Sequence, residues 1–267
     1  EGTYVCTITD ENGCSITDTV TINEPTAITT SSISNNINCN GGNNGFITVI
    51  ATGGTANYSF QINNGGYSGP TPYPYTFDSL FAGVYTIDIL DANNCSSQIT
   101  DTILQPDSIS ATFTVTNVSC NGGNDGAITV TATGGTANYS FQIDSGGYSA
   151  STPNPYTFDS LFAGVYTIDV KDANNCVAQI SGKINQPSSP LSLIITNIDS
   201  VNCYGQNDGA ITVTAGGGTA IYSFQINNSG YSGPTPYPYT FDSLFAGIYT
   251  IDVIDANNCS SQIVDAI

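Results

Sequence analysis

The chain has 267 residues, 21 of them acidic against two basic ones, for a net charge of −19, and it contains no His, Met or Trp. A polyanion of this kind is repelled by nucleic acid and by anionic membrane surfaces, so we expect neither as a partner. No apolar run approaches the ~20 residues of a membrane-spanning helix.

One sequence occurs three times. Thr-Phe-Asp-Ser-Leu-Phe-Ala-Gly-Val-Tyr-Thr-Ile-Asp begins at Thr76, recurs unchanged at Thr157 and returns at Thr240 with Ile248 in place of valine. Repetition at this length is typical of tandem domains. We therefore expect a fragment of a preceding repeat, followed by three full repeats: residues 1–25, 26–106, 107–187 and 188–267. Because residue 1 falls inside a predicted strand, we expect a stretch of a longer periodic polypeptide.

The second repeat shows the strand pattern most clearly. Apolar and polar residues alternate in short runs that are typical of half-buried strands. These runs are residues 109–115, 127–132, 139–143, 156–158, 165–170 and 177–184. Gly, Asn and Asp separate them, and prolines interrupt the connection before residue 156. The pattern predicts an all-β fold, an elongated array of immunoglobulin-like antiparallel β-sandwich repeats with about seven strands each.

Two turns of each repeat are marked by Gly, Asn and Asp. The first turn follows the first strand, at residues 121–126 of the second repeat, and the last turn precedes the last strand, at residues 172–175. The segment Leu161–Tyr166 between two later strands resembles a tyrosine corner, in which a tyrosine hydroxyl binds back across a turn. The sequence therefore predicts a structural role for three tyrosines: Tyr85, Tyr166 and Tyr249.

The order of motifs resembles a known repeat. Cys-Asn-Gly-Gly-Asn-Asp-Gly-Ala-Ile-Thr-Val-Thr-Ala begins at Cys120, and Leu-Phe-Ala-Gly-Val-Tyr, Asp-Ala-Asn-Asn-Cys and Gln-Pro follow. This order resembles the SprB-type repeat of long surface adhesins and gliding proteins of Bacteroidota. The resemblance covers each of the three copies and the leading fragment. It implies an extracellular, tandemly repeated, non-enzymatic module at the cell surface, with no catalytic residues to carry over.

Cysteines sit after the first strand and directly after the last turn of every repeat: Cys39, Cys95, Cys120, Cys176, Cys203 and Cys259. Without histidine or a Cys-x-x-Cys motif, disulfides in an oxidising compartment are favoured over zinc. Two pairings are open. One lies within a repeat, such as Cys39–Cys95. The other joins consecutive repeats, as Cys39–Cys176 and Cys120–Cys259, because a strand of about 20 Å separates the two turns of one sandwich.

Two further cysteines lie in the leading fragment. Cys6 occupies the inward position that Ile87 holds in the first repeat, and Cys14 corresponds to Cys95. We expect both to pair with cysteines outside residues 1–267.

Five aspartates are candidate metal ligands. They lie at the start of the last turns or inside the first turns: Asp91, Asp125, Asp172, Asp208 and Asp255. Turn formation and solubility explain them in ordinary terms. The alternative is calcium at the repeat junctions, since hard oxygen ligands suit this ion. No other cofactor is expected.

Asp followed by Ser or Thr and then an aliphatic residue occurs seven times, which resembles the O-glycosylation acceptor of Bacteroidota. The candidate hydroxyls are Thr19, Ser79, Thr102, Ser108, Ser160, Ser200 and Ser243. Three of them belong to one repeated turn, where Asp and Ser are ordinary turn formers. The other four lie near repeat boundaries. The pattern favours covalently attached glycans.

Catalysis is not expected, because no His can serve as a base and the carboxylates form no unique pair. We expect a structural region of an extracellular filament or surface stalk. Its expected partners are the neighbouring repeats of the same chain and further copies of the chain, with which it self-associates into fibres. The alternative is a multivalent adhesin that binds polysaccharide through exposed aromatic residues. Those residues are Tyr67, Tyr73 and Tyr75, repeated at Tyr231, Tyr237 and Tyr239.

Overall fold

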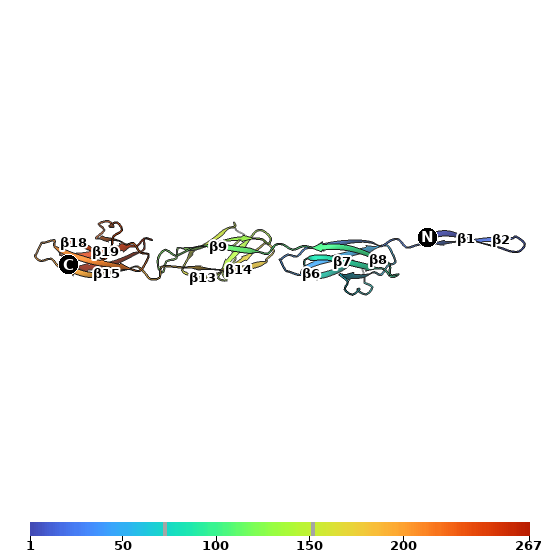
Figure 1. Cartoon of the computed structure of the whole chain (residues 1–267), viewed down its shortest axis with the longest axis horizontal. Helices are drawn as coiled ribbons and strands as arrows, with labels where there is room; N and C mark the ends of the chain where they lie inside the picture. The colour runs from blue at the N-terminus through green and yellow to red at the C-terminus, as the bar shows by residue number, and fades with distance from the viewer. Residues whose placement is uncertain (72–73, 151–152) are drawn as a thin grey trace. The chain divides into compact units, whose positions relative to one another are not determined.

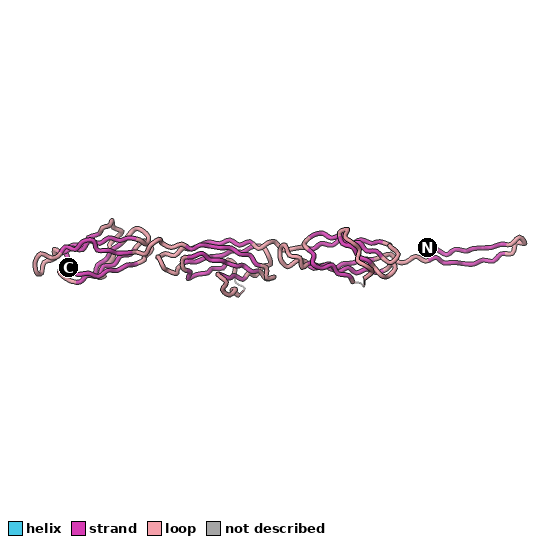
Figure 2. Tube along the Cα trace, turned by 90° about the horizontal axis from the view of Figure 1, so that it is seen from below, coloured by secondary structure: helices cyan, strands magenta, loops and turns pink. Residues whose placement is uncertain are grey.

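A computed structural model describes residues 1–71, 74–150 and 153–267. Strands and loops account for all of these residues, and Figure 2 shows no helix among them. By its internal contacts the chain divides into two units, Glu1–Ser108 and Ile109–Ile267, and each is described by itself.

The first unit contains an antiparallel hairpin and one sandwich. The hairpin is formed by β1 (Gly2–Thr9) and β2 (Ser15–Ile22). The sandwich contains β3 (Thr29–Asn35), β4 (Gly45–Thr52), β5 (Ser59–Ile62), β6 (Tyr75–Leu80), β7 (Gly83–Leu90) and β8 (Ser96–Ile103).

The second unit contains two sandwiches, whose strands Figure 1 draws from green to red. The second repeat contains β9 (Ser110–Thr116), β10 (Gly126–Thr133), β11 (Ser140–Ile143), β12 (Tyr156–Leu161), β13 (Gly164–Lys171) and β14 (Val177–Ile184). The third contains β15 (Ser192–Asp199), β16 (Gly209–Gly216), β17 (Ser223–Ile226), β18 (Tyr239–Leu244), β19 (Ile248–Ile254) and β20 (Ser260–Ala266).

Each repeat has two antiparallel sheets of three strands. In the second repeat the orders are β12-β10-β9 and β11-β13-β14, and the other repeats have the same topology. The sandwich fold is the one predicted, although the described residues of each repeat form six strands rather than about seven. In the third repeat every residue between β17 and β18 is described and none is in a strand. Proline lacks an N–H to donate, so the prolines of this connection cannot continue a strand ladder there.

The core of each repeat lies between its two sheets. In the second repeat the inward positions of the strands bury Ile128, Val130, Phe141, Ile168 and Val170 completely. Burying one such side chain contributes about 1.5–3 kcal/mol. The alternation of apolar and polar residues places these five side chains on the inward faces of the two sheets, because successive side chains of a strand point to opposite faces. Separate clusters that are likewise rich in isoleucine and valine fill the first and third repeats.

A β-bulge interrupts the edge strand of each first sheet. In the second repeat Gly126 pairs with Leu161 while Ile128 pairs with Phe158, so β12 has one residue more than β10 across this step. The extra residue leaves Ser160 with a φ of 56°. A Cβ atom on Gly126 would lie 2.7 Å from the Leu161 carbonyl oxygen, so only glycine fits opposite the bulge.

Candidate functional site

The turn before the penultimate strand is closed by a tyrosine in every repeat. The Tyr85 hydroxyl donates to the Phe81 carbonyl oxygen at 2.9 Å, and Tyr166 does the same to Phe162 at 3.0 Å. Tyr249 bonds to Phe245 at 2.9 Å. This is the geometry of a tyrosine corner, in which the side chain replaces a backbone hydrogen bond across the turn.

The last turn of each repeat is built on a buried aspartate. In the third repeat Asp255 is only 4% exposed. Its Oδ1 accepts hydrogen bonds from the backbone N–H of Asn257 and Cys259, both at 2.9 Å. Its Oδ2 accepts from the N–H of Thr219 at 2.8 Å, in the loop between β16 and β17. One carboxylate therefore shapes the turn and ties it to a distant loop.

Asp91 and Asp172 make the same three bonds in their own repeats. Asp91 accepts from Thr55, Asn93 and Cys95 at 2.8–2.9 Å. The hydrogen bond from the Thr55 N–H, followed by those from Cys95 and Asn93, lowers the pKa of Asp91 from its ordinary value of 3.8, against the opposing effect of desolvation.

The aspartates of the first turns bind the backbone just before the turn. Asp125 Oδ1 accepts from the Ser119 N–H at 3.0 Å, and Asp208 Oδ1 accepts from the Asn202 N–H at 3.2 Å. Hydrogen bonds from Ser119 lower the pKa of Asp125, and those from Asn202 lower the pKa of Asp208.

All five calcium candidates therefore hold backbone N–H groups. Within the described part of the chain, no group of three or more His, Cys, Asp or Glu side chains comes together as a metal site. Calcium binding at the junctions stays an untested hypothesis.

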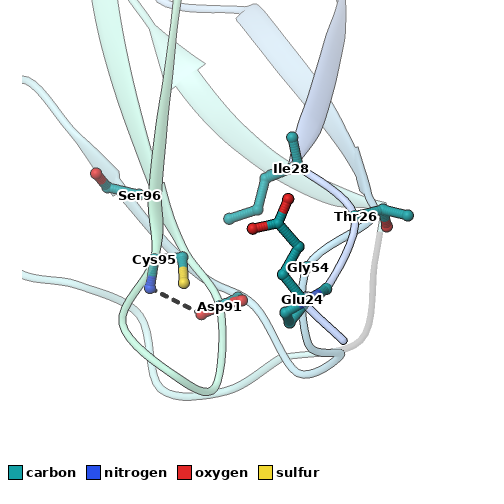
Figure 3. A pocket seen from close by; sticks show the side chains of 9 residues that line it. Glu24, Thr26, Ile28, Gly54, Asp91, Cys95 and Ser96 are labelled. Atoms are coloured by element: carbon teal, nitrogen blue, oxygen red, sulfur yellow. Dashed lines mark hydrogen bonds between the residues drawn. The ribbon is translucent and has the colours of Figure 1, made fainter. Parts of the chain in front are cut away.

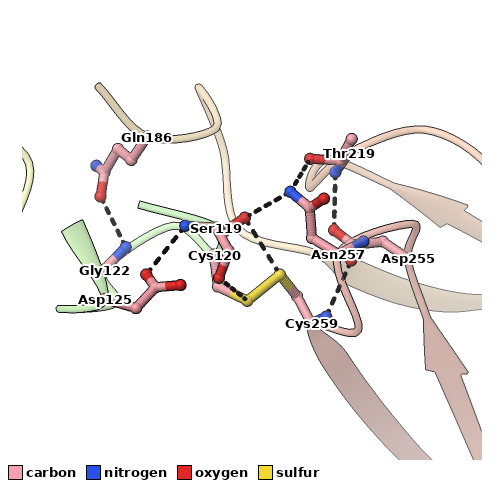
Figure 4. Close-up of a disulfide and its surroundings, with 9 residues drawn as sticks. All are labelled: Ser119, Cys120, Gly122, Asp125, Gln186, Thr219, Asp255, Asn257 and Cys259. Atoms are coloured by element: carbon pink, nitrogen blue, oxygen red, sulfur yellow. Dashed lines mark hydrogen bonds between the residues drawn. A yellow bond between two sulfur atoms is a disulfide. The ribbon is translucent and has the colours of Figure 1, made fainter. Parts of the chain in front are cut away.

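A disulfide joins the second repeat to the third. Cys120, directly before the first turn of the second repeat, bonds to Cys259, after the last turn of the third, at a sequence separation of 139. Figure 4 shows the bond with the Asn257 side-chain amide beside it. That amide donates to the Ser119 carbonyl oxygen at 3.0 Å. The pairing is between consecutive repeats, one of the two alternatives that the sequence leaves open.

Neither Cys39 nor Cys176 is a free thiol. Cys95 and Cys203, which the sequence places among the disulfide cysteines, are instead free and exposed. The within-repeat pairs Cys39–Cys95 and Cys203–Cys259 are therefore absent, because the two turns of a repeat are separated by the length of a strand. Cys6 and Cys14 are free and exposed as well.

A pocket opens beside Cys95. Its volume is about 410 Å³, and its lining includes Glu24, Ile28, Asp91 and Cys95. Figure 3 shows the Cys95 N–H bonded to Asp91, as in the other last turns, while its thiol carries no disulfide. The last turn of the first repeat thus has the shape of the disulfide-bonded turn of the third.

The seven candidate glycosylation hydroxyls belong to exposed residues. Ser79, Ser160 and Ser243 occupy the extra position of the bulge, with φ angles of 56–57°. Each donates its hydroxyl to the preceding aspartate at 3.1–3.2 Å. The bulge therefore presents these hydroxyls on an edge strand, where solvent reaches them.

The aromatic residues of the adhesin hypothesis divide into two groups. Tyr75 is half-buried and stacks on Phe60 with ring centroids 5.1 Å apart, and Tyr239 stacks on Phe224 at 5.4 Å. The prediction that these two tyrosines are exposed is wrong, because they point between the sheets.

The remaining tyrosines of this hypothesis lie on the surface where they are described. Tyr67 is 43% exposed, Tyr231 41% and Tyr237 54%. Tyr73 lies outside the described residues.

Sequence reasoning missed two functional contacts. It assigned the last-turn aspartates to turns or calcium and overlooked their bond to the loop between the second and third strands. It also overlooked the hydrogen bond that the Asn257 side-chain amide donates to the Ser119 carbonyl oxygen across the repeat junction. The signal for both was the sequence Asp-Ala-Asn-Asn-Cys, which occurs at Asp91, Asp172 and Asp255.

The inter-repeat bond predicts the outcome of a trypsin digest. The two lysines, Lys171 and Lys183, divide the chain into residues 1–171, 172–183 and 184–267. After thiol alkylation and denaturation without reduction, we expect residues 184–267 to stay linked to 1–171 through Cys120 and Cys259. Mass spectrometry before and after reduction reads the link. Recovery of residues 184–267 alone without reductant would contradict the pairing.

Three solved structures illustrate the similarity of fold. A C-terminal fragment of intimin, solved with an intimin-binding domain, is 17% identical with a TM-score of 0.34 over 60% of this chain and 64% of that one, so the chain spans less than two thirds of it. A tetra-tandem repeat from the extending region of a large adhesion protein is 15% identical with a TM-score of 0.32, and the match covers 99% of this chain and 81% of that one. Extracellular cadherin domains 3–6 of protocadherin gamma B2 are 12% identical with a TM-score of 0.28, and the match covers 99% of this chain and 81% of that one.

These likenesses concern the fold alone. A search of curated proteins gives no match. The residues that the structure describes form no helix of membrane-spanning length and hydropathy. The family model of the SprB repeat matches three regions, residues 31–67, 112–147 and 195–231, which begin in the first strands of the three sandwiches. Each of the three near-identical copies is therefore similar to the SprB repeat over part of its length.

Proposed function

We propose that the chain is the structural part of an extracellular filament or surface stalk, in which covalently joined repeats give reach and stiffness. SprB repeats and disulfide bonding support an extracellular repeat region. The observation that carries the proposal is the Cys120–Cys259 bond, because it joins one folded repeat to the next where a single linker would otherwise leave a hinge.

Glycosylation is the second part of the proposal. The exposed hydroxyls of the Asp-Ser and Asp-Thr sequences, three of them on bulges of edge strands, would hold sugars away from the core. Sugars at these places would also shield the strand edges from pairing with other chains. Repeats of this kind are typically non-enzymatic, and the proposed role needs no catalytic group.

The alternative is a multivalent adhesin. Exposed Tyr67, Tyr231 and Tyr237 favour it, since tyrosine offers both a ring face and a hydroxyl to a sugar. The second repeat replaces Tyr237 by Asn154, so the aromatic surface is not kept in every copy. A filament is favoured over an adhesin for this reason.

Electron microscopy of the native protein tests the proposal. We expect straight filaments with a regular repeat, which bend more sharply after the disulfides are reduced. The measured masses of the peptides that contain the seven candidate hydroxyls should exceed the masses of the unmodified sequences. Filaments that bend equally before and after reduction of the disulfides would contradict the structural role. Peptide masses equal to those of the unmodified sequences would contradict glycosylation. Binding of polysaccharide by the chain on a glycan array would favour the adhesin instead.

A further inference from the structure

The inter-repeat bond is formed by Cys120, beside the first turn of the second repeat. The first turn of the third repeat presents the same kind of surface without a bond. On the second repeat, Cys120 of this surface forms a disulfide with Cys259 of the third repeat. In the third repeat the equivalent cysteine, Cys203, is free and exposed. The same chain therefore shows one joined and one open form of the surface.

The backbone of the open turn has the shape of the joined one. Gly205 has a φ of 78°, and its counterpart Gly122 has a φ of 79°. In the joined turn the Gly123 N–H donates to the Cys120 carbonyl at 2.9 Å. In the open turn the Gln206 N–H donates to Cys203 in the same way, at 3.1 Å.

The polar contact across the joint needs only backbone from the receiving turn. The Asn257 amide donates to the carbonyl oxygen of Ser119, the residue before Cys120. The residue before Cys203 is Asn202, whose N–H is held by Asp208 as that of Ser119 is held by Asp125. Every residue type supplies a backbone carbonyl, so the change from serine to asparagine keeps the acceptor.

An apolar pocket adjoins the open turn. It has a volume of about 360 Å³ and is lined by Val201, Tyr204, Gly205, Gln206, Phe245 and Ala246. Tyr204 is fully exposed and Phe245 is 56% exposed. Covering such a surface is favourable at roughly 25 cal/mol per Å² of apolar area. The surface around Cys203 is thus suited to being covered by another folded element.

The matching element is also present in the chain. The last turns of the first and third repeats share the sequence Asp-Ala-Asn-Asn-Cys and the same carboxylate hydrogen bonds. Their positive-φ residues also agree, with 63° at Asn94 and 65° at Asn258. A last turn is therefore shaped before it meets a partner.

We propose that residues 201–206, which lead into the first turn of the third repeat, and Phe245 dock the last turn of a further repeat that follows in series, and that Cys203 bonds to the cysteine of that turn. This inference rests on the proposed structural role and adds the rule by which the array extends. Two thiols lose two protons and two electrons as the S–S bond forms. A low-molecular-weight disulfide, such as oxidised glutathione, takes them up and becomes two thiols.

The test extends the chain by one repeat. A second copy of residues 104–187 is joined after Ile267, which matches Ile103, so that the Leu-Gln-Pro linker and a complete repeat follow. The protein is oxidised in a glutathione buffer, alkylated and mapped by mass spectrometry. We expect a bond between Cys203 and the added copy of Cys176, with the added copy of Cys120 alkylated as a free thiol.

The matched control is Cys203→Ser in the same extended chain, which should leave the added copy of Cys176 alkylated. The Cys120–Cys259 bond reports in every sample that the original repeats have folded. Alkylated Cys203 beside an intact Cys120–Cys259 bond would overturn the inference, as would a bond from Cys203 to Cys95 of another molecule. Straight native filaments together with a free Cys203 would overturn the docking rule alone and leave the proposed function standing.

Discussion

Replacing Cys120 by serine should lower the free energy of unfolding of the third repeat by about 4 kcal/mol. The bond ties together residues separated by 139 positions, and this cross-link restricts the unfolded chain. On the chain-entropy model, a loop of about 100 residues contributes nearly 5 kcal/mol, and the serine variant loses this restriction. It keeps every strand and every core side chain.

The matched control is Cys203→Ser. It makes the same chemical change at the same place in the next first turn, but Cys203 is free and exposed. We expect a change below about 0.5 kcal/mol, as for surface substitutions in general. Urea unfolding monitored by tyrosine fluorescence, together with thermal unfolding in a calorimeter, measures the free energy of unfolding of both variants. Equal losses for the two variants would mean that the bond contributes nothing to the stability of the joint.

Replacing Asp172 by alanine should destabilise the second repeat by about 3 kcal/mol, because several backbone N–H groups lose their acceptor at once. Asp172 is 3% exposed and accepts from Thr136, Asn174 and Cys176 at 2.8–2.9 Å. Alanine offers no oxygen, and the loop around Thr136 would separate from the last turn.

Asp169→Ala is the control for this variant. Asp169 lies three positions away on the same hairpin and accepts from the Gln179 side chain at 2.8 Å, at an exposed site. We expect its replacement to cost less than about 1 kcal/mol. Thermal unfolding at neutral pH measures both. A similar melting temperature for the two variants would show that the buried carboxylate is dispensable.

The pH dependence of the first repeat follows from the same arrangement. The pKa of Asp91 is lowered in the folded state, chiefly by the Thr55 N–H, so ionised Asp91 stabilises the fold. This contribution is fully present above the unfolded pKa of about 3.8 and is lost as the pH falls through the lower folded value. Stability of the last turn is therefore retained at neutral pH and lost only in strong acid.

Alternation along the sequence was enough to predict the strands that pair regularly. The run at residues 177–184 coincides with β14, because each inward residue there has an apolar neighbour in the core. The run at 156–158 was too short, since β12 continues to Leu161. Asp159 and Ser160 look like turn formers, yet a bulge accommodates them inside the strand.

Contacts between distant segments could not be predicted in this way. Asp172 binds the backbone of Thr136, and nothing in the local sequence of either residue marks the other as its partner. The disulfide pairing was open for the same reason, since spacing alone permits both arrangements. Tyr75 was the avoidable error, because Tyr75 and Phe77 alternate with polar residues and so share the inward face of β6.

The proposed extracellular role implies an order of events for the bond from Cys120 to Cys259. A chain that leaves the cell from its N-terminus exposes Cys120 long before Cys259, and Cys176 emerges in the interval. Folding of the second repeat holds its two turns a strand length apart, which protects Cys120 from the earlier thiol. On this order of emergence, we expect the folded second repeat to keep Cys120 as an open thiol until the third repeat has folded. The bond would then close only when Cys259 is presented on a turn shaped by the buried Asp255.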